Sequence, residues 1–227
     1  MESPAAHRQS QKLGRLRLFA AALFALTVSS IPISAPAEAR SIRLVALGDS
    51  LTAGYGLNPG EAFPAVLEKA LKEKGFDVSV ANAGVSGDTA SAGAARVDWS
   101  VPDGTDGVIL ELGANDALRG LDPAGTDKAL RQALDRLKAR NIPVLLAGMY
   151  APRSLGAAYY EKFDAIYPKL ASDYGVDLYP FFLDGVAGEV KLNLQDGIHP
   201  TAEGIQKIVE RMLPTVESFL RRIQPPS

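Results

Sequence analysis

The chain has no cysteine and only two histidines among its 227 residues. Without cysteine there can be no disulfide bond, no thiolate metal site and no cysteine nucleophile. Zinc is not expected either, because one histidine outside the N-terminal leader would leave only carboxylate-rich coordination. We therefore expect no metal ion and no cofactor, and any chemistry that needs an imidazole must use His199.

Charge of neither sign is in large excess. The 24 basic and 26 acidic residues give a formal net charge of −2, and removal of the leader described next would make the remainder slightly more acidic. The remainder has no basic stripe, which is the usual signature of a surface that binds phosphate backbones. Nucleic acid is therefore not expected as a partner.

Long apolar runs are also missing. The run at 18–28 is too short to span a bilayer, which takes about 20 apolar residues. It follows four basic residues (Arg8, Lys12, Arg15 and Arg17) and precedes the small-x-small sequence Ala37-Glu38-Ala39. This pattern predicts a secretory signal peptide at 1–39, and a mature domain at 40–227 in the periplasm or the medium, with no stable membrane anchor. The alternative is an uncleaved N-terminal anchor.

The mature region alternates short apolar runs with longer amphipathic ones. We predict strands at 42–47, 76–81, 108–112, 143–147 and 176–179. We predict helices at 63–74, 126–139, 157–171 and 201–220. Strands that are apolar throughout and alternate with helices indicate a parallel sheet covered on both faces. The expected fold is a single α/β domain, a three-layer αβα sandwich with about five parallel strands.

Polar residues follow the first three predicted strands. Ser50 follows the first, the segment Gly84-Val85-Ser86-Gly87 follows the second, and Asn115 follows the third. Ligands of such sheets bind outside the carboxyl ends of the strands. The three segments should therefore meet at one edge of the sheet.

Ser50 is a candidate nucleophile. A serine at a strand-to-helix turn is exposed, and the N–H groups of the helix can face a developing negative charge. The simpler alternative is that Asp49 and Ser50 only cap the following turn. The sequence Gly48-Asp49-Ser50-Leu51 is not the G-x-S-x-G elbow of the α/β-hydrolases.

Asp196 and His199 are three residues apart, which on a helical turn would bring their side chains together. The carboxylate could then orient the ring while the ring takes a proton from the serine. We expect Pro200 to be the first residue of the closing helix. A surface histidine beside a turn aspartate is common, so this pair gains weight only together with Ser50.

Two loops could donate hydrogen bonds to an oxyanion: 82–89 through its backbone, and 113–116 through the Asn115 amide. Loops rich in Gly, Asn and Asp are usually plain turns, so each signal is weak alone. Asp88 and Asp116 are expected to brace these loops rather than to take part in chemistry.

Taken together, four segments resemble the SGNH (GDSL) hydrolase family, and within it the secreted bacterial thioesterase I/lysophospholipase/arylesterase group. They are the segments of Ser50, Gly87, Asn115 and Asp196/His199, in this order and spacing. The resemblance covers essentially the whole mature region, including Leu-Arg-Gly at 118–120 and Pro-Phe-Phe at 180–182.

The resemblance implies a flavodoxin-like αβα sandwich with Ser50 as nucleophile and Asp196 and His199 completing a triad. It also implies an oxyanion hole formed by the N–H groups of Ser50 and Gly87 and by the side chain of Asn115. Gly84 is a nearby alternative to Gly87 and ranks below it.

The expected activity is hydrolysis of acyl and aryl carboxylic esters through an acyl-enzyme, with thioesters and lysophospholipids as further substrates. The partner would be a small-molecule or lipid ester. An apolar wall beside the site is expected from Leu118, Leu121, Met149, Tyr150 and Pro152. The sequence does not indicate an oligomeric state.

Two other functions remain open at this point. A carbohydrate O-deacetylase of the same family would need polar subsites, whereas 117–123 and 149–156 are apolar. A flavodoxin-like module could bind a phosphate or flavin at the loop from Gly48 to Gly54, but that function leaves the pair Asp196/His199 without a purpose.

Overall fold

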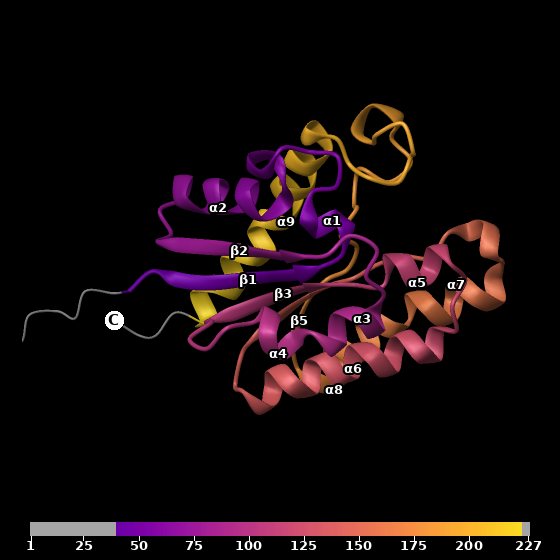
Figure 1. Cartoon of the computed structure of the whole chain (residues 1–227), viewed down its shortest axis with the longest axis horizontal. Coiled ribbons are helices and arrows are strands. Elements are labelled where there is room, and N and C mark those ends of the chain that lie inside the picture. Colours follow the sequence, from indigo (N-terminus) through magenta and orange to yellow (C-terminus); the bar gives the residue numbers. More distant parts are fainter. Residues whose placement is uncertain (1–39, 224–227) are drawn as a thin grey trace, which may run out of the picture. The chain divides into compact units, whose positions relative to one another are not determined.

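The computed structural model describes residues 40–223, so the predicted signal peptide lies outside the described residues. These residues form a five-stranded sheet in the order β2-β1-β3-β4-β5, with all neighbouring strands parallel (Figure 1). The strands are β1 (Ile42–Gly48), β2 (Val78–Gly84), β3 (Gly107–Glu111), β4 (Val144–Ala147) and β5 (Asp177–Tyr179). The predicted α/β class with about five parallel strands is confirmed.

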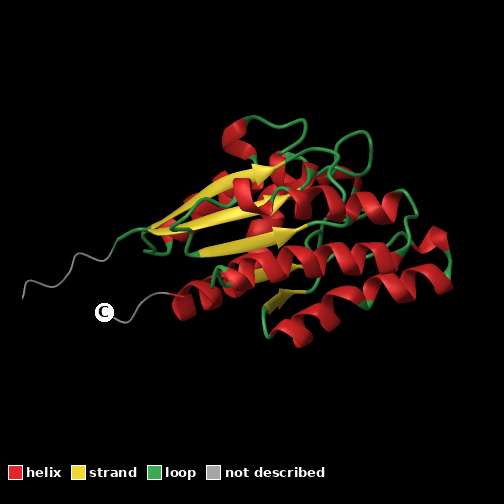
Figure 2. Cartoon of the chain, turned by 60° about the horizontal axis from the view of Figure 1, so that its bottom comes forward, coloured by secondary structure: helices red, strands yellow, loops and turns green. Residues whose placement is uncertain are grey.

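Helices cover both faces of the sheet, as Figure 2 shows. The helices α2 (Phe63–Glu73) and α9 (Ala202–Ile223) pack together on one side, and α3 (Ala90–Ala95), α6 (Pro123–Ala139) and α8 (Ile166–Tyr174) pack on the other. The strands β3 and β4 are buried at every position, which explains why their sequences are apolar apart from Glu111, the last residue of β3. Within residues 40–223, no helix is both long and apolar enough to span a bilayer.

The third predicted helix is in fact two helices. In place of one helix at 157–171, α7 (Ala157–Asp164) ends before Ala165, and α8 begins at Ile166. Pro168 provides the physical reason. It has no N–H for the carbonyl of Asp164, four residues earlier, and its ring would clash with that carbonyl in a continuous helix.

Four short helices were not predicted. They are α1 (Ser50–Ala53), α3, α4 (Val97–Ser100) and α5 (Ala114–Leu118). Each has only four to six residues, too few for an apolar period to show. Two of them carry candidate site residues, because α1 begins at Ser50 and α5 contains Asn115.

The sheet register brings the ends of the first three strands together. Gly48, the last residue of β1, pairs with Gly84 of β2 on one side and with Glu111 of β3 on the other. The segments that follow these residues therefore start from one edge of the sheet, as predicted.

Candidate active site

Ser50 occupies the turn from β1 into α1. Asp49 is the N-cap of α1, and its side chain accepts a hydrogen bond from the Leu51 N–H at 2.9 Å. The capping role expected as an alternative thus belongs to Asp49. Ser50 is the first residue of the helix, and its side chain is free to face the neighbouring cleft.

His199 connects Ser50 to Asp196. Its Nε2 lies 2.9 Å from the Ser50 Oγ, and its Nδ1 lies 2.7 Å from Oδ2 of Asp196. These three side chains come from two segments 149 residues apart. They form one continuous line of hydrogen bonds, which is the arrangement that a proton transfer from a hydroxyl to an imidazole requires.

The segment of Asp196 and His199 is a turn and not part of a helix. Oδ1 of Asp196 accepts the N–H groups of Ile198 at 2.9 Å and His199 at 3.0 Å, which fixes the carboxylate beside the ring. These bonds and the contact with the His199 side chain lower the pKa of Asp196 to about 2. The carboxylate therefore stays ionised at neutral pH.

The prediction that Pro200 begins the closing helix is wrong. Pro200 forms an antiparallel bridge with Asn193, and His199 O accepts the Leu194 N–H at 2.7 Å. This pairing holds Pro200 extended, so α9 begins at Ala202.

Tyr55 packs against the His199 ring, which sequence analysis did not anticipate. The ring centroids are 4.4 Å apart with an interplanar angle of 34°. Tyr55 lies two residues after the end of α1, so the same turn that presents Ser50 also supports the imidazole. No periodic pattern marks this residue, because it lies in a loop.

Gly84 and Gly87 have different surroundings. The Gly84 N–H donates to Asn82 Oδ1 at 3.0 Å, and a Cβ at Gly84 would lie 2.3 Å from the backbone nitrogen of Ala53. Gly84 thus serves the close packing of β2 against α1. Gly87 has a φ of +88°, which favours glycine, and a Cβ there would meet only the Arg119 guanidinium, at 4.0 Å.

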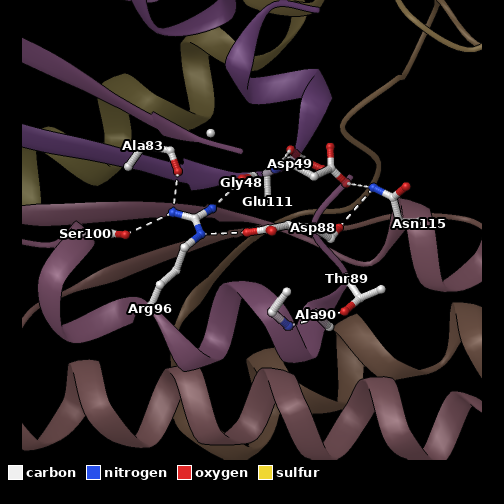
Figure 3. A network of polar contacts seen from close by, with 12 residues as sticks. Gly48, Asp49, Ala83, Asp88, Thr89, Ala90, Arg96, Ser100, Glu111 and Asn115 are labelled. Carbon is white, nitrogen blue, oxygen red and sulfur yellow. Dashed lines mark hydrogen bonds and ion pairs between the residues drawn. The ribbon is translucent and has the colours of Figure 1, made fainter. Parts of the chain in front are cut away.

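Asn115 faces the segment of Ser50 from α5. Its Nδ2 donates to the Asp88 carbonyl oxygen at 3.0 Å and to Asp49 Oδ2 at 3.3 Å (Figure 3). These contacts fix the direction of the amide, because both partners are acceptors and require the nitrogen on that side. Asn115 and Ser50 both line the same cleft.

Arg96 joins the ends of β1 and β2 to the loop that follows β2. Its Nε donates to Asp88 Oδ2 at 2.6 Å, and its other nitrogens donate to the carbonyl oxygens of Gly48 at 2.7 Å and Ala83 at 2.8 Å (Figure 3). Arg96 is buried, so its charge needs these partners.

Asp88 and Asp116 lie where they brace loops. Asp116 accepts the Ala90 N–H at 2.8 Å and the Thr126 hydroxyl at 3.1 Å.

A second carboxylate lies buried beside Asp49. Oε2 of Glu111 accepts the Thr52 hydroxyl at 2.8 Å and the Asp49 N–H at 3.3 Å, whereas its Oε1 is buried with no hydrogen-bond partner within the described part of the chain. Burial raises the pKa of Asp49 to about 6, and burial together with the nearby Asp49 charge raises the pKa of Glu111 well above its ordinary value. A glutamate at the end of an otherwise apolar strand was the available sequence signal.

A cleft of about 720 Å³ adjoins Ser50 and His199. Four of the five residues predicted to form an apolar wall line it: Leu118, Met149, Tyr150 and Pro152. The fifth, Leu121, does not line the cleft. Its carbonyl oxygen accepts a hydrogen bond from the Tyr159 hydroxyl at 2.7 Å. The further lining residues that the sequence did not predict include Arg153, Phe181, Leu183 and Ile198. Across residues 40–223, no three His, Asp or Glu side chains are grouped so that they could hold a metal ion.

Comparisons with known proteins agree with this architecture. The model of the GDSL-like Lipase/Acylhydrolase family matches residues 46–207. The chain is 41% identical over 170 residues to the thioesterase 1/protease 1/lysophospholipase L1 of Escherichia coli K12, which covers 74% of this chain and 80% of the relative. It is 39% identical over 179 residues to an arylesterase of Vibrio mimicus, covering 78% of this chain and 89% of that one. Among solved structures, the SGNH-hydrolase family esterase AlinE4 matches with 47% identity and a TM-score of 0.68, covering 80% of this chain and 97% of that one.

Proposed function

The chain belongs to the GDSL-like Lipase/Acylhydrolase family and is a carboxylic ester hydrolase, and we propose that it works through Ser50, His199 and Asp196 as a catalytic triad. The observation that carries this proposal is the line of hydrogen bonds from Ser50 Oγ through both ring nitrogens of His199 to Asp196. An aspartate that stays ionised beside Nδ1 favours the tautomer whose Nε2 can accept the serine proton.

The reaction proceeds in two acyl transfers. Ser50 Oγ attacks the ester carbonyl carbon while His199 Nε2 takes the hydroxyl proton. His199 then gives this proton to the leaving alcohol or thiol as the carbonyl–heteroatom bond breaks, which leaves an acyl-serine. Water attacks the acyl-serine in the same way, with His199 taking its proton and returning it to Ser50.

The oxyanion of each tetrahedral intermediate is stabilised by the N–H groups of Ser50 and Gly87 and by the Asn115 amide. Ser50 is the first residue of α1, so its N–H has no partner within the helix. The Gly84 N–H already donates to Asn82, which argues against Gly84 as an oxyanion donor. This supports Gly87 as the backbone donor from the loop that follows β2. Donors that the fold already holds in place stabilise the transition state because only small rearrangements are needed as charge develops.

The substrates are acyl and aryl esters, with thioesters and lysophospholipids in the same class. The mostly apolar lining of the cleft, from Leu118 to Phe181, supports an acyl or aryl group in this space. The names of the relatives, a thioesterase/lysophospholipase and an arylesterase, point to the same classes. The predicted signal peptide at 1–39 supports a periplasmic or secreted enzyme.

Replacement of the proposed nucleophile tests the mechanism. Ser50→Ala should lower turnover of a nitrophenyl ester by several orders of magnitude, because no other group would form the acyl-enzyme. It should also abolish covalent labelling by a fluorophosphonate probe. Ser172→Ala, an exposed serine of α8, is the matched control and should keep full turnover and labelling. Turnover that persists in Ser50→Ala would end the proposal.

A further inference from the structure

Arg119 contacts both residues that we propose as oxyanion donors outside α1. It lies at the end of α5 and is exposed. Its Nη2 donates to the Gly87 carbonyl oxygen at 3.0 Å and to Asn115 Oδ1 at 3.3 Å. Within residues 40–223, its side chain makes no other hydrogen bond and no ion pair. The only hydrogen bonds that this side chain makes within the described residues therefore join the two donor segments.

We propose that Arg119 is a positioning residue of the oxyanion hole, which holds Gly87 and Asn115 at a fixed separation. The inference rests on the proposed function, because it assumes that these two residues stabilise the oxyanion. Arg119 does not line the cleft, so it would act through its two partners and not through the substrate. The structure gives it no other role.

The Gly87 loop needs such a support on its outer side. From inside the protein, Arg96 holds Asp88, and Asp88 in turn accepts the Asn115 amide. On the outer side, a Cβ at Gly87 would lie 4.0 Å from the guanidinium of Arg119, the one group of residues 40–223 within that distance apart from the chain neighbours of Gly87. Gly87 itself is exposed and has a left-handed φ. The peptide that follows it is held from one side by the Asp88 N–H, which donates to the Val85 carbonyl oxygen at 3.1 Å, and from the other by Arg119, which donates to the Gly87 carbonyl oxygen.

The contact with Asn115 has a second effect. A cation on Oδ1 keeps the amide from rotating, so that Nδ2 remains on the side of Asp88, Asp49 and the cleft. Hydrogen bonds to a charged donor are stronger than neutral ones, and they polarise the amide so that its N–H donates better. Removal of the guanidinium should thus destabilise the transition state more than the enzyme–substrate complex.

The test uses Arg119→Gln, Arg119→Lys and Asn115→Ala in the full chain, with 4-nitrophenyl butyrate as a neutral substrate that offers Arg119 no charge to bind. Arg119→Gln should lower kcat roughly tenfold with KM unchanged, since small misplacements of oxyanion donors cost rate and not binding. Arg119→Lys should recover part of the loss, because it keeps the charge without the planar fork. Arg136→Gln, which removes another exposed arginine, should leave kcat unchanged.

The double variant separates positioning from other roles. In the Asn115→Ala background, Arg119→Gln should cost less than tenfold, because one of its two hydrogen-bond partners is already absent. Equal losses in both backgrounds would overturn the inference, as would a rise in KM with kcat unchanged. Full turnover of Arg119→Gln alone would overturn the inference and leave the proposed function standing. Full turnover of Asn115→Ala would overturn the oxyanion assignment together with the inference.

Discussion

The Asn115 side chain has two N–H bonds, and the resting structure uses both. One is given to the Asp88 carbonyl oxygen at 3.0 Å and the other to Asp49 Oδ2 at 3.3 Å. To accept a hydrogen bond from Asn115, an oxyanion in the cleft must therefore displace one of these two acceptors. The longer contact, to Asp49, is the one that a developing negative charge would displace at the smaller cost.

We predict that Asn115→Ala lowers kcat/KM by about 10²–10³-fold, equal to about 2.7–4 kcal/mol of transition-state stabilisation, the range found for a single oxyanion donor. Steady-state kinetics on a nitrophenyl ester would measure this loss. Asn141→Ala, in the turn after α6, is a control away from the cleft. A loss of less than about threefold would remove Asn115 from the proposed oxyanion hole.

The candidate residues could be identified from the sequence either by their rarity or by their position in it. His199 stands out because it has no rival, and Ser50 and Asn115 because each follows an apolar strand. Tyr55, Glu111 and Arg119 were missed as contributors to the site. Each acts through a contact with a distant or unpatterned segment, which neither periodicity nor spacing can reveal.

Among the elements, the approach of β2 to α1 determines where Ser50 lies. A Cβ on Gly84 would lie 2.3 Å from the Ala53 nitrogen and 2.8 Å from the Asp49 carbonyl oxygen, both of them backbone atoms of the α1 turn. Backbone atoms cannot rotate away as the end of a flexible side chain can. A methyl group at this position would therefore push α1, and Ser50 with it, away from the sheet.

Gly84→Ala should lower the free energy of unfolding by about 1–3 kcal/mol, as overpacking usually does. It should also lower kcat, because Ser50 moves relative to His199. Urea unfolding and ester hydrolysis would measure the two effects. Gly125→Ala in α6, where a Cβ meets nothing within 4 Å, is the matched control and should be neutral or slightly stabilising. A Gly84→Ala protein with normal stability would contradict the close approach.

Elements with a long apolar period were predictable, and short ones were not. The buried stripe of α6, from Leu130 to Leu137, is the one expected from its sequence. The break between α7 and α8 was missed because apolar periodicity continues across Ala165, while the missing N–H of Pro168 interrupts the hydrogen bonds. The short helix α1 is capped by Asp49, α5 has no side-chain cap at its N-terminus, and both depend on tertiary packing, so their sequences alone do not specify them.

At the scale of the whole molecule, two buried carboxylates next to each other reduce the stability of the fold in a pH-dependent way. Asp49 and Glu111 are almost fully buried, and both have a raised pKa in the folded protein. In the unfolded chain they would ionise near their ordinary values of about 4. The folded state therefore binds more protons than the unfolded state from about pH 4 upward, and its stability must fall as the pH rises through these folded values.

We predict that Glu111→Gln becomes more stable relative to the parent as the pH rises from about 5 to about 8. Glutamine keeps the shape and stays neutral, and its amide oxygen can still accept the Thr52 hydroxyl and the Asp49 N–H. Over this interval the folded parent retains protons on Glu111 and Asp49 that the unfolded chain releases, so its stability falls as the pH rises, whereas in the variant only Asp49 contributes to this fall. Urea unfolding of both proteins across the pH series gives the difference directly. The control is Glu73→Gln at an exposed position of α2, whose free energy of unfolding should differ from that of the parent by the same amount at every pH. A constant difference for Glu111→Gln as well would contradict the prediction, because it would mean that Glu111 ionises alike in the folded and unfolded states.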